Sequence, residues 1–251
     1  MINGFRIYDT HTHLGTARHS GRSCDAETML RHMDRCGVDR SLLIPFPVVA
    51  DCRQAHDEIA RAVRAHPDRF AGAACLYPFL PEPEFRDELK RCAQEMDFRA
   101  LKLQPQYQAL NPMSERSDFL FAAAEEFALP VIVHTGSGAP FALPSLYIPK
   151  ARKFPCLPIV LGHAGGSVYY HEAIVAAEVC TNIYVELSSL MPHHAMELVA
   201  RVPSSRLMIG SDLPESVETE IGKIVGLDAV EPVKRDILWN TGRRLFDRVE
   251  A

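Results

Sequence analysis

Eight short apolar segments recur along the 251-residue chain, and each is followed by a stretch with the spacing of an amphipathic helix. The segments end near Asp9, Ile44, Leu76, Leu103, His134, His163, Glu186 and Asp212. The mean interval between these ends is about 29 residues, close to the size of one βαβ unit. Eight such units over about 250 residues are typical of a closed (β/α)8 barrel. The sequence therefore predicts an α/β fold, a single TIM barrel with extra helices at its C-terminal end.

An open, doubly wound sheet is the alternative fold for the same order of elements. Such a sheet normally carries a glycine-rich turn after its first strand, where a nucleotide binds. Here the first apolar run, residues 5–8, is followed by Asp-Thr-His-Thr-His at 9–13, and the glycines at 162–166 come too late and lack that spacing. No linker of changed composition divides the chain. We therefore expect residues 1–251 to form one domain.

Composition and charge narrow the class of partner. The formal net charge is −5, with no basic run, which argues against a nucleic-acid ligand. No apolar run approaches the roughly 18 residues that a membrane helix needs, so we expect no membrane partner. The seven cysteines are scattered and form no C-x-x-C pair, as expected for buried thiols in a reducing compartment. These features predict a cytoplasmic protein that acts on a small molecule.

Ionisable residues stand where the apolar strands end. They are His11 and His13 on the first strand, Lys102 on the fourth, and His134, His163, Glu186 and Asp212 on the fifth to eighth. The chemistry of such barrels collects at the carboxyl ends of the strands. One unpaired buried charge costs several kcal/mol, so a cluster of them calls for a common partner, and a metal ion is the simplest one. For Glu186, contact with substrate and a structural hydrogen bond are equally expected.

The first of these strands carries two histidines separated by one residue, a spacing that can bind a metal ion. Alternate residues on a strand share a face, so we expect Asp9, His11 and His13 to point to the same side. Two imidazoles so placed can bind one metal ion and leave further coordination positions open. Asp9 is then expected to support one of the ligands from outside the coordination sphere.

Six segments, spread over nearly the whole chain, match the motifs of one family in order. They are residues 9–13, 101–105, 130–136, 161–166, 210–214 and 240–246. In them the sequence resembles the amidohydrolase superfamily and, within it, the amidohydrolase-2 group of metal-dependent hydrolases and decarboxylases. Relatives in this group are often dimers or larger assemblies, so the resemblance implies a homodimer or a larger homo-oligomer.

The resemblance also implies roles for individual residues. His11, His13, His134 and Asp212 match the metal ligands, and His163 matches the histidine that positions or activates the water or substrate. Zinc is the expected ion, with manganese as the alternative, because nitrogen and oxygen ligands do not choose sharply between them. A bound zinc lowers the pKa of its water to near 7, and Asp212 or His163 can then move the proton. Which of the two is the principal base stays open.

Lys102 has two readings within the resemblance. In some branches of the superfamily the lysine on the fourth strand is carboxylated and bridges two metal ions. In others it is unmodified and meets an anion of the substrate. An unmodified lysine is repelled by a dication, so we expect it either at some distance from the metal or paired with a carboxylate.

The leading prediction is a metal-dependent hydrolase of an ester, lactone, amide or related bond in a small substrate that can carry a carboxylate. The first alternative is non-oxidative decarboxylation of an aromatic or unsaturated acid at the same metal. A metal-dependent nuclease or phosphoesterase is disfavoured by the acidic balance and by Lys102, and a non-catalytic barrel by the complete ligand set. Residues on loops expected to rim the pocket are Arg18, His19, Arg22, Gln104, Gln106 and Tyr107.

Overall fold

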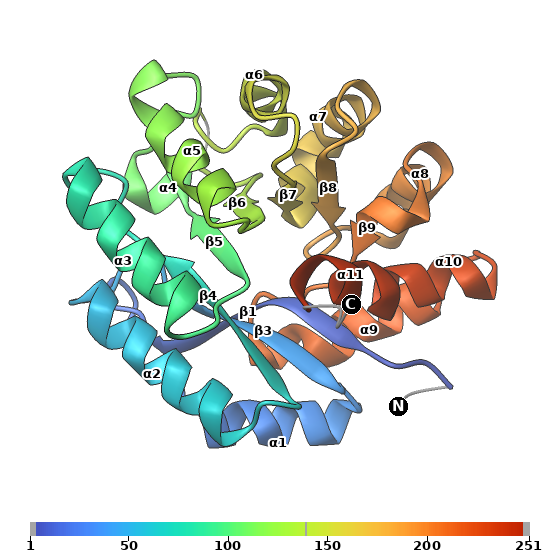
Figure 1. Cartoon of the computed structure of the whole chain (residues 1–251). Helices are drawn as coiled ribbons and strands as arrows, with labels where there is room; N and C mark the ends of the chain where they lie inside the picture. Colours follow the sequence, from blue (N-terminus) through green and yellow to red (C-terminus); the bar gives the residue numbers. More distant parts are fainter. Residues whose placement is uncertain (1–3, 139, 248–251) are drawn as a thin grey trace.

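The computed structural model describes residues 4–138 and 140–247, in which one curled sheet is surrounded by helices (Figure 1). The strands are β1 (Tyr8–Thr16), β2 (Ser23–Cys24), β3 (Arg40–Pro45), β4 (Phe70–Cys75), β5 (Ala100–Leu103), β6 (Val131–His134), β7 (Ile159–Gly162), β8 (Ile183–Glu186) and β9 (Leu207–Met208). Their order in the sheet is β2-β1-β3-β4-β5-β6-β7-β8-β9. All neighbouring pairs are parallel except β1 with β2.

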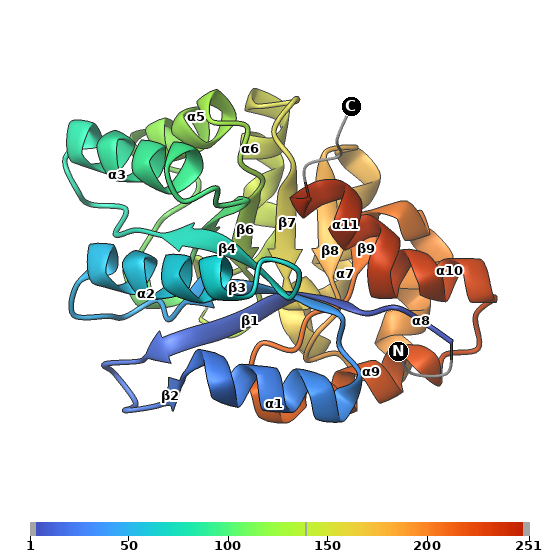
Figure 2. The ribbon, with the colours of Figure 1, turned by 60° about the horizontal axis from the view of Figure 1, so that its bottom comes forward.

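The chain after β9 returns to β1 and closes the ring. Thr10 N donates to Ile209 O at 3.0 Å, and Asp212 N donates to His11 O at 2.7 Å. Thr12 and Asp212 form a parallel bridge. The predicted (β/α)8 barrel is therefore confirmed. The sequence did not predict the short hairpin partner β2, which extends from the end of β1 (Figure 2).

Helices cover the outer face of the sheet. They are α1 (Ala26–Cys36), α2 (Cys52–Ala65), α3 (Glu82–Gln94), α4 (Pro105–Gln108), α5 (Asp118–Glu126), α6 (Ile148–Lys153), α7 (Gly166–Val179), α8 (Pro192–Arg201), α9 (Val217–Val225), α10 (Glu231–Arg235) and α11 (Thr241–Phe246), with a π-helical turn at Asp236–Asn240. Among the described residues, none of these helices has the length and apolar character needed to cross a membrane. The helices α9 to α11 are the extra carboxyl-terminal helices that the sequence predicts.

Local sequence explains where the helices begin and end. Asp25 accepts a hydrogen bond from Thr28 N at 2.7 Å and caps α1, and Asp51 caps α2 in the same way through Arg53 N at 2.8 Å. Helix α1 ends at Gly37, whose φ of 64° is a left-handed conformation that glycine adopts without steric cost. These caps fix the turns that lead into and out of the strands.

Two apolar cores lie on the two faces of the sheet. The larger core packs the sheet against the helices and includes Met29, Phe85 and Leu198. The smaller core fills the inside of the barrel with Leu42, Ile132, Val160 and similar residues. Phe246 of α11 joins the inner core, and its ring lies 6.4 Å from that of Tyr8 at the start of β1. The amino ends of the strands are therefore closed by apolar side chains, which leaves the carboxyl ends for the site.

A buried carboxylate links α2, α3 and β4. Glu88 accepts hydrogen bonds from His56 Nδ1 at 2.7 Å and from Arg91, and His56 Nε2 accepts from Cys75 N at 3.0 Å. Burial alone would raise the pKa of Glu88, but the hydrogen bonds from His56 and Arg91 outweigh it and lower the pKa to about 2.

This carboxylate gives the fold a measurable dependence on pH. Because the unfolded chain binds the proton of Glu88 more tightly, the stabilisation is fully present above about pH 4.5 and is lost as the pH falls towards 2. We expect Glu88 to contribute at most about 3 kcal/mol to the free energy of unfolding at neutral pH. Urea unfolding of the wild type and of Glu88→Gln at several pH values measures this. The difference between them should shrink between pH 5 and 2, and a constant difference would contradict the assignment.

Candidate metal centre

The carboxyl ends of the strands bring the predicted ligands together. Asp212 Oδ1 lies 3.5 Å from His13 Nε2 and 3.8 Å from both His11 Nε2 and His163 Nε2. The ring of His134 lies 4.8 Å from that of His163, which is itself 4.7 Å from the ring of His11. His11, His13 and Asp212 place one ligand atom each within 4.8 Å of one another. The structure thus gathers four histidines and one aspartate from the ends of four strands, β1, β6, β7 and β9.

The hydrogen-bond partners assign the tautomer of each imidazole. Each ring donates its single proton to an acceptor of the chain: His11 Nδ1 to Glu186 Oε2 at 2.9 Å, His13 Nδ1 to Pro45 O at 3.1 Å, His134 Nε2 to Ser137 O at 2.8 Å, and His163 Nδ1 to Ser188 Oγ at 2.7 Å. The Ser188 hydroxyl in turn donates to Glu186 Oε2 at 3.0 Å, so its oxygen is free to accept from His163. The second nitrogen of every ring therefore carries a lone pair.

Burial sets the charge of the cluster at neutral pH. Burial lowers the pKa of His11 and His163 well below the ordinary value and that of His134 to about 4, so these rings are neutral. For Asp212, burial acts in the opposite direction, but the contact of its carboxyl with His13 at 3.5 Å is the largest of the effects that outweigh it and hold the pKa well below its usual range. The centre therefore combines the Asp212 carboxylate with the neutral rings of His11, His134 and His163.

Lys102 lies inside this cluster rather than apart from it. Its Nζ is 2.7 Å from His11 Nε2, the lone pair that the prediction assigns to a metal. Burial lowers the pKa of Lys102 to about 8, although Asp212, Cys75 and Glu186 act to raise it. The expectation that an unmodified lysine lies at a distance, or pairs with a carboxylate, is wrong here. The barrel interior is so narrow that the side chain from β5 reaches across to β1, where an imidazole nitrogen is the nearest acceptor.

The donor set of the centre fits a divalent ion. The Nδ1 atom of His134 is buried and has no hydrogen-bond partner among the described residues. A buried polar atom left in this way is rare in proteins and points to a missing partner. Among the described residues, the donor that contacts one of these lone pairs is Lys102 Nζ, at His11 Nε2. Such an excess of nitrogen and oxygen acceptors fits a divalent metal such as zinc or manganese.

Glu186 supports the site through hydrogen bonds to the chain, a role for which its sequence left substrate contact as an equal alternative. Both its oxygens are engaged by the chain: Oε2 accepts from His11 Nδ1, from His163 N at 3.0 Å and from Ser188 Oγ, and Oε1 accepts from Ser188 N at 2.6 Å. The contacts of Glu186 among the described residues match the structural hydrogen bond, the second of the two roles expected for it. The feature of the sequence that pointed to the site was the position of Glu186 at the end of a strand. Such a carboxylate fixes the ring orientation of a metal-ligating histidine.

A glycine makes room for this arrangement. A Cβ atom on Gly210 would lie 2.7 Å from the Glu186 carboxyl carbon and 2.7 Å from the His11 Cβ. Both distances are shorter than any ordinary contact, so a larger residue would push the carboxylate away from the imidazole. The site also carries positive φ angles at His163 (65°) and Asp212 (63°), which non-glycine residues seldom adopt. The strand ends are thus shaped around the side chains of the centre.

Asp9 does not share the face of the two histidines, contrary to the alternation expected for β1. The register between β1 and β3 shifts between Asp9 and Thr12, so a bulge interrupts the alternation. Asp9 instead accepts from Ser211 N at 2.9 Å and Ser211 Oγ at 2.6 Å, beside Val38 and Ile221 in the layer of the helices. It fastens β1 to the segment that carries Asp212, and burial raises its pKa to about 7.

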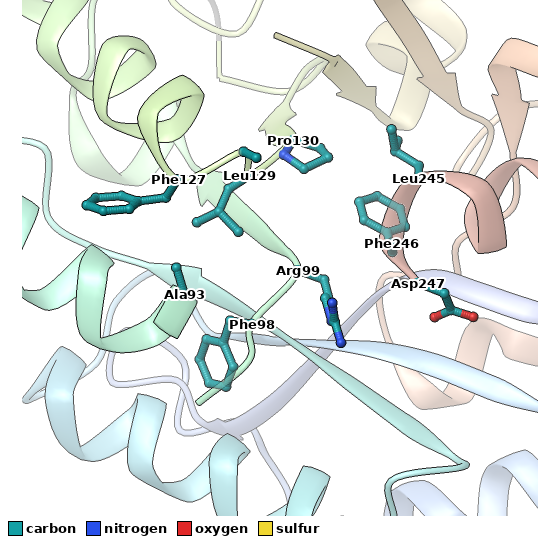
Figure 3. Close-up of a pocket in the computed structure, with 10 residues that line it drawn as sticks. Ala93, Phe98, Arg99, Phe127, Leu129, Pro130, Leu245, Phe246 and Asp247 are labelled. Carbon is teal, nitrogen blue, oxygen red and sulfur yellow. The ribbon is translucent and has the colours of Figure 1, made fainter. Parts of the chain in front are cut away.

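A cavity of about 340 Å³ opens from the centre to the surface. It is lined by His13 and Asp212 of the centre together with His19, Ser20, Arg22, Phe46, Pro47, Gln104, Tyr107 and Leu213. Four of the six residues expected at the rim line it, and Arg18 and Gln106 do not. A cavity of about 230 Å³ lies at the opposite end of the barrel, between Phe98, Arg99, Pro130 and Phe246 (Figure 3). None of the predicted site residues lines that second cavity, whereas His13 and Asp212 line the first.

Comparison with known proteins agrees with this geometry. The family model for amidohydrolases (Amidohydro_2) matches residues 47–248, a span that contains Lys102, His134, His163 and Asp212 and begins after His11 and His13. The chain is 27% identical over 157 residues to a 2-keto-4-carboxy-3-hexenedioate hydratase of Sphingobium. That match covers 53% of this chain and 44% of the relative, so it spans less than half of the hydratase.

Solved structures share the fold at low sequence identity. A putative amidohydrolase from Staphylococcus aureus has a TM-score of 0.78 at 17% identity, over 96% of this chain and 99% of that one. The 5-carboxyvanillate decarboxylase from Novosphingobium aromaticivorans, complexed with manganese, has a TM-score of 0.75 at 18% identity, over 97% and 96%. The 4-oxalomesaconate hydratase from Rhodopseudomonas palustris has a TM-score of 0.74 at 18% identity, over 96% and 95%. With the family match over most of its length, this chain belongs to the amidohydrolase family of enzymes.

Proposed function

We propose that the protein is a metal-dependent hydrolase that cleaves an ester, lactone or amide bond in a small carboxylated molecule. The observation that carries the proposal is the gathering of lone pairs around Asp212 Oδ1 at 3.5 to 3.8 Å. His11, His13, His134 and Asp212 would hold the ion, with zinc first and manganese as the alternative. When bound, such an ion polarises a carbonyl group and lowers the pKa of water to near 7.

His163 is the proposed general base. Its Nε2 carries a lone pair and lies 3.8 Å from Asp212 Oδ1, while its Nδ1 proton is held by Ser188 Oγ. When Nε2 accepts a proton, the chain through Ser188 to Glu186 stabilises the imidazolium that forms. The same proton can then pass to the leaving group. Lys102 adds a cation to the centre beside His11, and such a cation would favour an anionic group of the substrate.

Lyase chemistry at the same centre is the second candidate. It is favoured by the names of the relatives, a hydratase in sequence and decarboxylases and a hydratase in structure. For decarboxylation, His163 in its protonated form would act as a general acid and donate its proton to the carbon from which carbon dioxide leaves. For hydration, the same group would help to add water across a double bond. The residues of the centre serve either reaction, so the product must decide.

A product assay on the metal-loaded protein separates these reactions. We expect lactones and esters of aromatic or unsaturated acids to release one proton equivalent per bond cleaved, measured by pH-stat titration. The matching amides are followed by the appearance of the free amine, because that amine takes up the proton near neutral pH. Free acids from the same panel are followed for carbon dioxide release and for loss of the ultraviolet absorbance of a conjugated double bond. His163→Gln should bind the metal normally and lose turnover by about 100-fold or more. Carbon dioxide or hydration products without any hydrolysis would overturn the leading proposal in favour of the second.

The compartment, the partner and the oligomeric state complete the proposal. We propose the cytoplasm as the compartment, because all seven cysteines are free thiols in the structure. The expected partner is a small molecule. A homodimer or larger homo-oligomer is proposed on the family resemblance, and multi-angle light scattering would test it.

A further inference from the structure

Outside the metal centre, three histidines and a glutamate gather where α7 packs beside α8 (Figure 1). They are His171 of α7 and His193, His194 and Glu197 of α8. The ring of Tyr170 lies 4.1 Å from those of His171 and His194, between centroids. The ring of His194 lies 3.9 Å from that of His193. The proposed function gives these residues no role.

His171 and Glu197 are placed as two ligands of one ion would be. His171 Nε2 lies 3.5 Å from Glu197 Oε2. This distance exceeds that of a good hydrogen bond, which is about 2.7 to 3.2 Å. It matches the edge of a tetrahedral zinc site, about 3.4 Å when each ligand atom lies about 2.0 to 2.2 Å from the ion. The side chains of His171 and Glu197 are 71% and 49% exposed, so an ion from solvent can reach both.

The chain holds the Glu197 carboxylate in this orientation. The hydroxyl group of Tyr170 donates a hydrogen bond to Glu197 Oε1 at 2.9 Å. The other oxygen, Oε2, is the one that faces His171. A carboxylate that binds a metal is commonly fixed by such a hydrogen bond from outside the coordination sphere. Tyr170 is only 7% exposed, so its hydroxyl group is a firm anchor for the carboxylate.

His193 is positioned to supply a third ligand. It stands four residues before Glu197 on α8, and side chains four residues apart lie on the same face of a helix. The side chains of a helix also lean towards its amino end, which brings Glu197 towards His193. Because His193 is exposed, its ring can turn towards the ion without displacing a buried group. Two imidazoles and one carboxylate leave the fourth position of a zinc ion to water.

We propose that His171, His193 and Glu197 form a second zinc site, which joins α7 to α8 at the surface. The site goes beyond the proposed function, because it shares no residue with the metal centre. Its three ligands are exposed, so we expect a Kd in the micromolar range and loss of this ion on gel filtration, whereas the buried centre keeps its own. A plain ion pair between His171 and Glu197 is the alternative, and it would take up no zinc.

Zinc titration of the holoenzyme tests the proposal. The protein is loaded with zinc, gel-filtered so that the centre alone is filled, and titrated with zinc chloride in a calorimeter. We expect one further ion to bind per wild-type chain. In His171→Ala, His193→Ala and Glu197→Gln this binding should be at least about 10-fold weaker, since losing a ligand costs no less than losing a residue hydrogen-bonded to one. His66→Ala removes an exposed histidine at the end of α2 and should keep the further ion.

A second readout locates the added ion. In ¹⁵N-edited NMR of the histidine rings, the signals of His171 and His193 should shift with the added zinc, and that of His66 should not. Absence of further zinc binding at submillimolar concentration would overturn the proposal. Binding that persists in the three variants, or that falls equally in His66→Ala, would also overturn it. Because the titration needs no turnover, a protein without hydrolysis would count against the proposed function alone.

Discussion

His11→Ala is expected to leave the protein without bound metal and to reduce turnover by more than about 100-fold. This loss exceeds the roughly 10- to 100-fold effect that is usual when a residue hydrogen-bonded to a metal ligand is removed. His11 is completely buried, and its Nε2 lone pair lies 3.8 Å from Asp212 Oδ1. Removing the ring takes away one of the proposed ligands and also the acceptor that Lys102 contacts. The remaining ligands would then share their space with an unpaired ammonium group, which repels a dication.

Metal content per chain measures this directly, by plasma mass spectrometry on protein purified without chelator and reconstituted with zinc or manganese. We expect about one ion per wild-type chain and none in His11→Ala. His66→Ala is the matched control, because His66 is an exposed histidine that ends α2 away from the centre. A His11→Ala protein that keeps its full metal content would refute the proposed ligand set.

Lys102→Met decides between the two roles of the lysine in the same experiment. If Lys102 is unmodified, its ammonium competes with the metal for His11 Nε2, and the substitution should keep one ion and tighten its binding. If it is carboxylated and bridges two ions, the wild type should contain two, and the variant one or none. The contact of 2.7 Å between Lys102 Nζ and His11 Nε2 leads us to expect the first result.

The barrel was predictable because its signal is repeated. The eight strands of the barrel and most of its helices follow from local patterns, such as the caps at Asp25 and Asp51, and eight repeats of one pattern allow few folds. The same pattern shows that the ionisable residues lie at the ends of strands. Because the carboxyl ends of parallel strands lie on the same side of a barrel, these residues could be predicted to lie close together. The structure brings one nitrogen each of His11, His13 and His163 to that side, within 3.8 Å of Asp212 Oδ1.

The details that escaped prediction depend on contacts between distant parts of the chain. The bulge in β1 is a matter of register against β3, so the sequence around Asp9 could not reveal that its carboxylate faces the helices. Likewise, Lys102 meets His11 only because β5 and β1 face each other across a narrow barrel. The approach of His171 to Glu197 depends in the same way on the packing of α7 against α8.

Glu186→Gln is expected to lower metal affinity by about 10- to 100-fold although Glu186 is not a proposed ligand. The carboxylate accepts four hydrogen bonds, from His11 Nδ1, His163 N, and the Ser188 amide and hydroxyl. An amide offers one oxygen and one NH2 group, so at least one of these donors would face another donor. If the NH2 group faces His11, the ring must move its proton to Nε2, where it blocks the lone pair that would bind the metal.

Chelator competition measures the affinity, and ¹⁵N-edited NMR of the histidine rings reports the tautomer of His11. Glu84→Gln removes an exposed carboxylate from the first turn of α3 and serves as the matched control. Lower affinity together with an altered His11 tautomer would show that the carboxylate acts by orienting the ring. Lower affinity with an unchanged tautomer would show instead that it acts through its negative charge, because that charge strengthens the attraction of the whole centre for a dication. Unchanged affinity would mean that His11 is held in place by the packing around Gly210 alone, and the role assigned to Glu186 would be wrong.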